Sequence, residues 1–294
     1  YILGDYETAE SIKLNSSFPF RTEEYKLLKS ITDTCPMLPM AQYYLGCLEY
    51  ANGKYKCAAE HFEKAIRLKP DFYAPYRNLA VAFYSHLNRR DEVLPLLKKA
   101  LFLNPKNSQL VYETAYTAAK LGVAPIDRIA FIKENIGDSI RDDTCLELAR
   151  AYNQNGSFDE AVKLLDSHTF VPCEGGEHAV AEQYMFAYHA VGRKLLSDGK
   201  YAEAAEAFEK AQILPQNLGA GLWNECKLVP HQFYLAECLE KIGEHEQADK
   251  IYDHILELEI DYFSNMHLPE LPYYQAMAYT AKGGFLKGRA LIDK

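Results

Sequence analysis

The chain has 294 residues, more than a single compact hydrophobic core usually contains, so we expect either two domains or an array of repeats. Hydrophobic residues make up 48% and charged residues 25% of the sequence, which is ordinary for a folded protein and argues against disorder. The 41 acidic residues exceed the 32 basic ones and give a net charge of −9, whereas nucleic-acid-binding surfaces are usually basic. No apolar run approaches the roughly 20 residues that a transmembrane helix needs. We therefore predict neither a nucleic-acid nor a membrane partner.

Seven cysteines are spread along the chain without a CxxC pair, and their number is odd. A disulfide framework is therefore not expected, and a reducing, cytoplasmic compartment fits this pattern. The sequence begins without a secretory signal and without an initiator methionine. We expect a trimmed chain or the tail of a longer polypeptide.

The first segment, residues 1–38, carries the weakest pattern. Residues 22–31 have an amphipathic sequence that predicts a helix capped by Thr22 and ended before Pro36. In the repeat period of the sequence that follows, this helix falls at the position of a second helix. We therefore predict that residues 1–38 form a degenerate N-terminal repeat or a cap. The pattern leaves the conformation of residues 1–20 unassigned.

The stretch from residue 39 to 70 has the pattern of a helix, a tight turn at Gly53, a second helix and a proline stop. Small residues such as Gly46 and Ala58 let two antiparallel helices approach closely, and large residues such as Phe62 fill the space to the next unit. These residue types at these offsets resemble the tetratricopeptide repeat, a helix-turn-helix unit of about 34 residues.

Further copies of this stretch follow it. Ala65 is repeated as Ala100, 35 residues later, so one residue is added, which we place in the turn around Asn88. Residues 39–167 are predicted to form four helix pairs, the third of them degenerate, and residues 185–294 two full pairs and a partial one. The turns within these pairs are marked by glycines, namely Gly53, Gly122, Gly156, Gly199, Gly243 and Gly283.

Two insertions interrupt the period. The turn glycines Gly156 and Gly199 lie 43 residues apart, which places an inserted loop with the sequence EGGE at 168–184. The next turn glycine, Gly243, follows after 44 residues and places a second inserted loop at 216–230. We predict an all-α fold, a right-handed superhelical solenoid of antiparallel tetratricopeptide helix pairs with two inserted loops.

A wider resemblance rests on five segments: Arg77-Asn78-Leu79-Ala80, Arg141-Asp142-Asp143, Phe170-x-Pro172, Glu174-Gly175-Gly176-Glu177 and Pro215-x-Asn217-Leu218-Gly219. From about residue 39 to 260 the sequence resembles the C-terminal tetratricopeptide region of a family of long bacterial proteins. In that family the repeats follow an uncharacterised β-rich domain similar to carbohydrate-active enzymes. Cys173 departs from the resemblance, which leads us to expect tryptophan there. The β-rich part is absent from this sequence, so no catalysis is carried over from it.

A binding groove is predicted along the inner face of the early repeats, which the first helix of each pair lines. Their inner-face offsets select Tyr43, Cys47, Tyr50, Arg77, Asn78, Val81 and Tyr84. Arg77 and Asn78 together have the donors to clamp a carboxylate, and tyrosines supply flat contact area at a low entropy cost. In the structural alternative, Asn78 braces the next turn and Arg77 pairs with a surface acid.

A second candidate region lies further along, where the predicted inner face is more polar. Its candidates are Arg150, Gln154, His189, Arg193 and Glu237. The EGGE insertion, with Glu174 and Glu177, would fold over this groove and complete a pocket with Tyr184, Asn217 and Trp223. Alternatively, both insertions pack against each other and stiffen the array.

Nothing in the sequence indicates catalysis. The EGGE insertion includes metal-ligand residue types at His168, Glu174, Glu177 and His178, but its two histidines do not have the i, i+4 spacing of the helical metal site HExxH. Neither a nucleophile elbow, a P-loop nor a GxGxxG motif is present. We expect no catalytic residue, no bound metal and no cofactor.

The function predicted from the sequence is a non-catalytic scaffold that binds a protein or peptide in its concave groove, or docks against other domains of its own longer chain. The alternative is an accessory C-terminal region of a larger carbohydrate-processing protein that packs on or completes its active site. Joint exposure of Trp223, Glu174, Glu177 and Tyr184 would favour this alternative. A third hypothesis is weak self-association through the terminal repeat, whose uncapped end leaves apolar surface unpaired.

Overall fold

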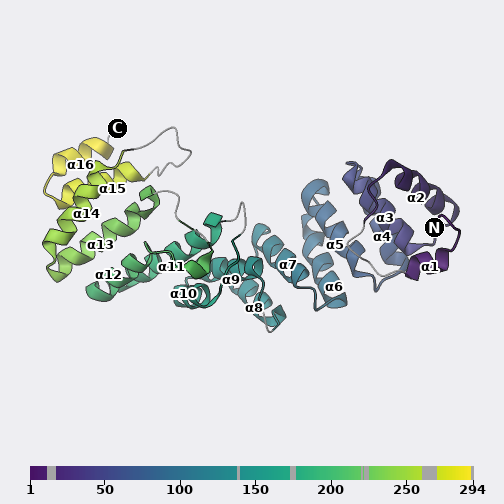
Figure 1. The fold of residues 1–294 in the computed structure, drawn as a ribbon, viewed down its shortest axis with the longest axis horizontal. Coiled ribbons are helices and arrows are strands. Elements are labelled where there is room, and N and C mark those ends of the chain that lie inside the picture. The colour runs from purple at the N-terminus through teal and green to yellow at the C-terminus, as the bar shows by residue number, and fades with distance from the viewer. Residues whose placement is uncertain are drawn as a thin grey trace. The chain divides into compact units, whose positions relative to one another are not determined.

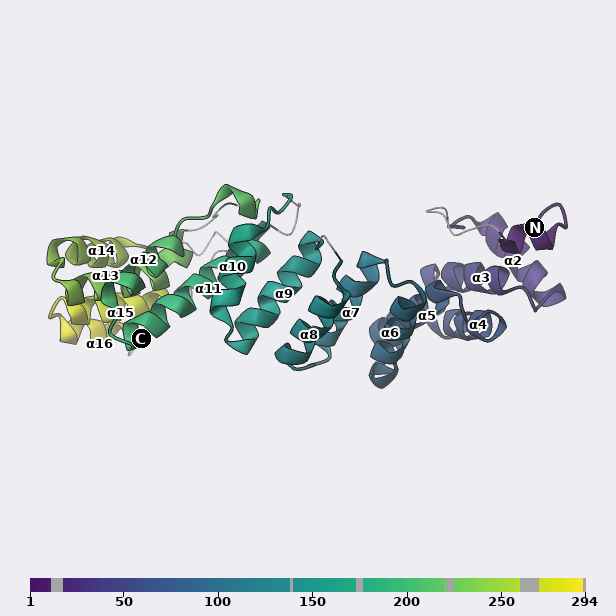
Figure 2. The ribbon, with the colours of Figure 1, turned by 90° about the horizontal axis from the view of Figure 1, so that it is seen from below.

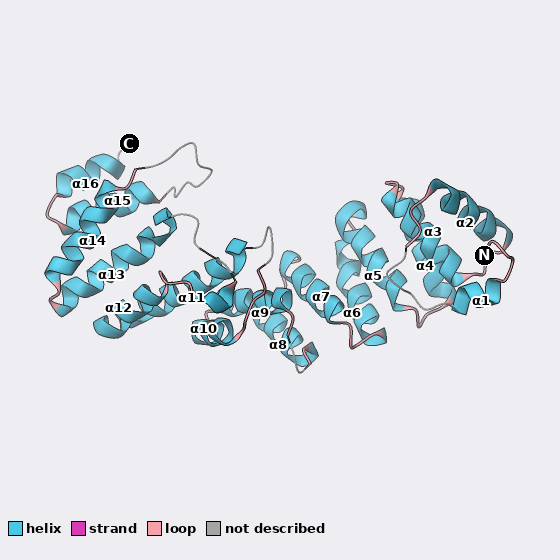
Figure 3. Ribbon diagram, in the orientation of Figure 1, coloured by secondary structure: helices cyan, strands magenta, loops and turns pink. Residues whose placement is uncertain are grey.

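The computed structural model describes residues 1–11, 18–137, 140–172, 177–219, 221, 225–259 and 270–292. These residues form helices, turns and loops, and no strand occurs among them (Figure 3). They belong to two units, Tyr1–Thr144 and Cys145–Lys294. The predicted all-α fold is confirmed.

The first unit consists of helices joined by short turns: α1 (Tyr6–Ser11), α2 (Thr22–Thr34), α3 (Pro39–Ala51), α4 (Tyr55–Leu68), α5 (Tyr73–Ala82), η1 (Phe83–Leu87), η2 (Arg90–Glu92), α6 (Val93–Leu103), α7 (Ser108–Lys120) and α8 (Pro125–Asn135). Helix α3 packs on α4, α5 on α6 and α7 on α8, and both views show the members of each pair side by side (Figures 1 and 2). These are the helix pairs that the repeat predicts.

Gly46 explains the close approach of α3 and α4. A Cβ atom at this position would lie 2.7 Å from the Cε1 atom of Phe62 on α4. The Phe62 side chain is 1% exposed and fills the space that the glycine leaves. Burial of a phenylalanine side chain stabilises a fold by about 1.5–3 kcal/mol. The small-against-large pattern of the sequence therefore becomes the core of the helix pair.

The residue added to the second repeat is accommodated in η1, a π-helical turn that continues α5. The N–H group of Asn88 donates to the carbonyl oxygen of Phe83, five residues earlier, and Asn88 adopts a φ of 53°. A π-helical turn encloses one residue more than an α-helical turn. The extra residue thus lies in the helix end next to the predicted turn at Asn88, where asparagine tolerates a positive φ.

Glu10 ties the N-terminal segment to α3. Its carboxylate accepts hydrogen bonds from the N–H groups of Met40 and Ala41, at 2.7 and 3.1 Å, where α3 begins. The hydroxyl of Tyr1 also donates to Glu10, at 2.6 Å. A negative charge at a helix N-terminus is favourable because the first N–H groups of the helix have no partner within it.

Helix α2 begins at Thr22, as predicted, but Thr22 is not its capping residue. The N-cap is Arg21, and the carboxylate of Glu24 accepts hydrogen bonds from the N–H groups of Phe20 and Arg21, both at 2.8 Å. The cap is therefore provided by an acidic side chain that reaches back from the first turn.

The second unit consists of most of α9 (Asp142–Asn155) and of α10 (Phe158–Ser167), α11 (Glu177–Ser197), α12 (Tyr201–Lys210), η3 (Gln216–Leu218), η4 (Glu225–Leu228), α13 (Val229–Ile242), α14 (His245–Glu257), α15 (Leu271–Ala281) and α16 (Phe285–Ile292). Helix α11 packs on α12, α13 on α14 and α15 on α16 (Figure 1). Helix α11 begins at Glu177, so it includes the last residues of the segment 168–184 that was predicted to be a loop. None of the helices in the described ranges is long and apolar enough to cross a membrane.

Candidate functional site

Arg77, on α5, is held in an ion pair with Glu113 of α7. Its Nε and Nη2 atoms donate to the two carboxylate oxygens of Glu113, at 2.8 and 2.5 Å. Its Nη1 atom donates to Oδ1 of Asn78, at 3.0 Å, and Gln109 also donates to Glu113, at 3.2 Å. The hydrogen bonds to Glu113 raise the pKa of Arg77 further above neutrality. A ligand carboxylate would have to displace Glu113 to use the forked face of this guanidinium.

Asn78 braces α3 rather than facing a groove. Its Nδ2 atom lies 3.3 Å from the hydroxyl of Tyr43 and 3.4 Å from Sγ of Cys47. Tyr43, which the sequence nominated as a groove residue, is 2% exposed because its ring packs against Phe62 and Phe72. Tyr43 therefore presents no surface to a partner. Burial raises the pKa of the Cys47 thiol to about 11, so this cysteine stays protonated.

A pocket of about 340 Å³ opens beside the Arg77–Glu113 pair, between α5 and α7. Its buried lining is aliphatic, and its exposed lining is aromatic and polar. Arg77, Val81 and Tyr84, which the sequence singled out, line it together with residues that the sequence did not single out. The lining residues are Arg77, Ala80, Val81, Tyr84, Ser85, Val93, Leu97, Gln109, Tyr112, Glu113, Tyr116 and Thr117.

Tyr50 belongs to a separate aromatic cluster. The ring of His86, in η1, stacks on Tyr55 with the centroids 3.5 Å apart, and the ring of Tyr50 lies 5.5 Å from His86. Tyr50 does not line the pocket between α5 and α7. Tyr50 and Tyr84 both pack against the same hydrophobic core cluster, and of the two only Tyr84 lines the pocket.

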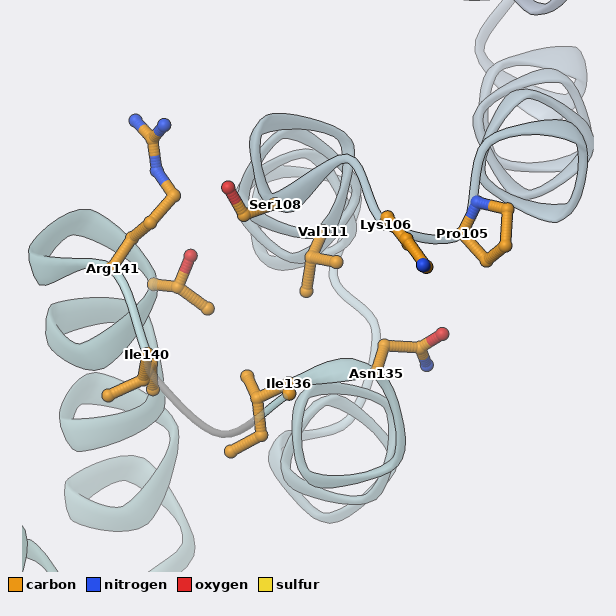
Figure 4. Close-up of a pocket in the computed structure, with 10 residues that line it drawn as sticks. Pro105, Lys106, Ser108, Val111, Asn135, Ile136, Ile140 and Arg141 are labelled. Carbon is orange, nitrogen blue, oxygen red and sulfur yellow. The ribbon is translucent and has the colours of Figure 1, made fainter.

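A second pocket, of about 560 Å³, lies where α7 begins and α8 ends (Figure 4). Val111 and Ile136 extend towards the space between their helices in Figure 4, and Ile140 and Arg141 are also among the lining residues. The guanidinium of Arg141 donates to both carboxylate oxygens of Asp143, at 3.1 and 2.7 Å. The sequence predicts no site here. The pocket forms where the ends of different helices come together, and the periodicity of a sequence does not predict which helix ends are neighbours.

In the second unit, His189 of α11 and His231 of α13 form a hydrogen-bonded pair, with their Nδ1 atoms 3.0 Å apart. Burial lowers the pKa of His231 to about 3, and burial with the nearby charge of Arg193 lowers that of His189 to about 4. The guanidinium of Arg193 lies 4.1 Å from the centroid of the Tyr234 ring, in a cation–π contact. Of the polar candidates, His189 is half-buried and paired with His231, and Arg193 contacts an aromatic ring.

The other candidates of the second unit fall into two groups. Arg150 pairs with the buried Glu147 on its own helix, and Tyr184 is 5% exposed, so it does not face an open surface. Glu174, Trp223 and the side chain of Glu177 lie outside the described residues. Within the described part of the chain, no group of three or more His, Cys, Asp or Glu side chains is arranged to hold a metal ion.

Asn217 joins the described parts of the two insertions. Its Nδ2 atom donates to the carbonyl oxygens of Leu165 and His168, at 2.8 and 2.7 Å, where α10 ends, and its own carbonyl accepts from the N–H of Phe170. Gly219 has a φ of 62°, and a Cβ there would lie 2.6 Å from the carbonyl oxygen of Phe170. These parts of the insertions pack against each other, as the structural alternative of the sequence analysis proposed.

Substitution of Asn217 by alanine is expected to destabilise this junction by about 1 kcal/mol, because it removes the donor to two part-buried carbonyl oxygens. Hydrogen exchange of the amides of residues 165–170 measures the effect, and they should exchange faster in N217A. Substitution of the exposed neighbour Gln216 by alanine is the matched control. Unchanged protection in N217A would show that the side-chain hydrogen bonds do not hold the insertions together.

Comparison with known proteins agrees with this architecture. A family model described as TPR repeat matches residues 46–86. The C-terminal part of a TPR repeat-containing protein from Cytophaga hutchinsonii is similar in structure at 15% identity, over 81% of this chain and 90% of that one, with a TM-score of 0.54. A chain from the structure of Naa15/Naa10 bound to HypK-THB is 17% identical, over 87% of this chain and 36% of that one, with a TM-score of 0.52. The chain therefore contains a tetratricopeptide repeat at residues 46–86 and has the all-α fold of tetratricopeptide-repeat solenoids.

Proposed function

We propose that the chain is a non-catalytic interaction module that binds a protein or peptide at the pocket between α5 and α7. The observation that carries this proposal is the pocket itself, which lies between the first helices of two successive repeats. Tyr84, Tyr112 and Tyr116 surround it, and Tyr116 is 37% exposed. Exposed tyrosines over a buried aliphatic lining are the composition of interface hot spots.

The π-helical turn supports the same location. Two residues of η1, Tyr84 and Ser85, line the pocket. Single π-helical turns inside α-helices occur frequently at functional sites. The added residue of the second repeat therefore changes the backbone where the proposed partner binds.

Fold analogy adds weaker support. The Naa15/Naa10 structure, which is similar to this chain in fold, is an assembly with HypK-THB. Fold does not by itself imply function, so we take from this likeness only the class of partner, a protein or a peptide.

The alternative function, an accessory part of a larger carbohydrate-processing protein, would be favoured by joint exposure of Trp223, Glu174, Glu177 and Tyr184. Tyr184 is buried, and no contact among the described residues favours this alternative. Membership of the family of long bacterial proteins that the sequence resembles is a separate proposal.

Site-specific photocrosslinking tests the proposed binding site. A photoreactive phenylalanine derivative replaces Ser85, which is exposed and lines the pocket, or the exposed Lys98 of α6, outside the pocket, as the matched control. After irradiation in a lysate of the source cell, we expect a discrete adduct from position 85 and none from position 98. Substitution of Tyr116 by alanine should lower the adduct yield about tenfold, because truncation of an aromatic anchor weakens binding by 1.4 kcal/mol or more.

Two results would contradict the proposal. Equal adducts from positions 85 and 98 would indicate collision rather than binding. An adduct at position 85 with the same yield in Y116A would place the partner away from the pocket.

A further inference from the structure

The pocket between α5 and α7 is electrically balanced. Arg77 and Glu113 are its charged lining residues, and they neutralise each other through two hydrogen bonds. The remaining lining residues are uncharged. Lys120 stands near the pocket, with its Nζ atom 5.2 Å from the centroid of the Tyr116 ring. The neutral lining determines which ligand groups the pocket favours.

A charged ligand group would gain little in this pocket. It would lose hydration while the two charged lining residues are already paired with each other, and burial of an unpaired charge is strongly unfavourable. An apolar side chain gains about 1.5–3 kcal/mol when it leaves water. The volume of about 340 Å³ is at the low end for ligand sites, so it suits an anchoring side chain rather than a large cofactor.

The polar groups around the pocket fit a peptide backbone. Ser85, Gln109 and Thr117 carry neutral hydroxyl and amide groups that both donate and accept hydrogen bonds. Backbone amides need such neutral partners when a peptide is bound. The aliphatic lining thus suits the apolar side chain of a peptide residue, and the neutral polar lining suits the amide groups of the peptide backbone.

We infer that the partner is a peptide segment that inserts an uncharged, apolar side chain into this pocket. The inference rests on the proposed function and specifies its ligand. Arg77 is a positioning residue here, because it holds Glu113 and balances its charge. This differs from the carboxylate clamp that the sequence predicted for Arg77 and Asn78, in which Arg77 receives the ligand.

Selection from a displayed library of short random peptides tests the inference. The full chain serves as bait, and two pools differ only in whether the peptide C-terminus is a free carboxylate or an amide. We expect both pools to yield peptides that share a large apolar residue. In a synthetic copy of a selected peptide, replacement of that residue by alanine should weaken binding about tenfold, measured by fluorescence anisotropy. Aspartate or lysine at that position should weaken it further.

Two bait variants make the charge argument specific. R77Q leaves Glu113 without its counter-charge, so selection should shift towards peptides with lysine or arginine as the anchor. E113Q leaves Arg77 without its counter-charge, so selection should shift towards aspartate, glutamate or a free C-terminus. Circular dichroism establishes that both variants remain folded. V81K, which places a charge at the pocket, should lose the apolar peptides, whereas V81I should keep them.

Each remaining outcome decides between the two claims. If the wild-type chain selects acidic or carboxylate-ended peptides and R77Q loses them, the apolar inference is overturned and the proposed function stands. If wild-type selection is apolar but neither charge variant changes it, the balanced pair does not set the specificity and the inference fails. If the folded wild-type chain enriches no peptide, the inference fails, and the photocrosslinking result at position 85 decides separately whether the proposed function stands.

Discussion

Replacing Phe208 by alanine is expected to lower the stability of the second unit by about 3–5 kcal/mol. The Phe208 side chain is fully buried, and it packs beside His189 and Tyr234. A Cβ atom on Gly192 of α11 would lie 2.8 Å from the Phe208 ring, so the ring packs directly against the α11 backbone. Truncation to alanine removes the ring from this contact and leaves a cavity between the two helices.

Hydrogen exchange followed by mass spectrometry measures this loss locally, which matters because repeat arrays need not unfold in one step. Peptides from α11, α12 and α13 should exchange faster in F208A, and those from α3 and α4 provide an internal reference. Substitution of Glu209, the exposed next residue, by alanine should leave exchange unchanged. A loss below about 1 kcal/mol in F208A would mean that the site relaxes around the cavity and that Phe208 does not anchor the pair.

Acidification from pH 7 to pH 5 is expected to destabilise the second unit by on the order of 3 kcal/mol through the His189–His231 pair. In the folded state the pKa of His189 is lowered to about 4 and that of His231 to about 3, from 6.5 in the unfolded chain. As the pH falls below 6.5 the unfolded state binds protons that the folded state does not bind. Each unit of pKa difference corresponds to about 1.4 kcal/mol.

The sign follows from the direction of both shifts. The contribution of the His189–His231 pair to the free energy of unfolding is fully present above pH 6.5. It is lost as the pH falls towards 4, the pKa of His189, and then 3, the pKa of His231. Protonation also turns the accepting Nδ1 atom into a donor, so the contact of 3.0 Å between the rings can no longer be a hydrogen bond. Arg193 opposes protonation of His189, and no acidic side chain is among the groups that shift either pKa.

Urea unfolding at a series of pH values measures this dependence. The wild-type chain should lose stability steadily from pH 6.5 downwards, and an H189Q/H231Q variant should show a flatter profile in that range. The single variant H245Q, at an exposed histidine, is the matched control and should follow the wild type. Parallel profiles for the wild type and the double variant would show that other groups carry the acid sensitivity.

The candidate site could be predicted only in part. Arg77 and Tyr84, which periodicity assigns to the inner face, both line the pocket between α5 and α7, because one face of a helix repeats at a fixed spacing. It gave no indication that Glu113, 36 residues after Arg77, occupies the guanidinium. It also counted Tyr43 as a surface residue, although the rings of Phe62 and Phe72 cover it.

The sequence by itself determined the helix pairs, their turns and their glycine-against-phenylalanine packing. Small, large and turn residues recur within one repeat, and such local patterns decide which helices form and how a pair closes. The tertiary structure alone decided the ion pair at Arg77, the histidine pair at 189 and 231, and the junction through Asn217. Each of these contacts joins residues of different helices or loops, from 36 to 52 positions apart. The physical reason is that a periodic sequence specifies the face on which a side chain lies, whereas its partner depends on how neighbouring repeats stack.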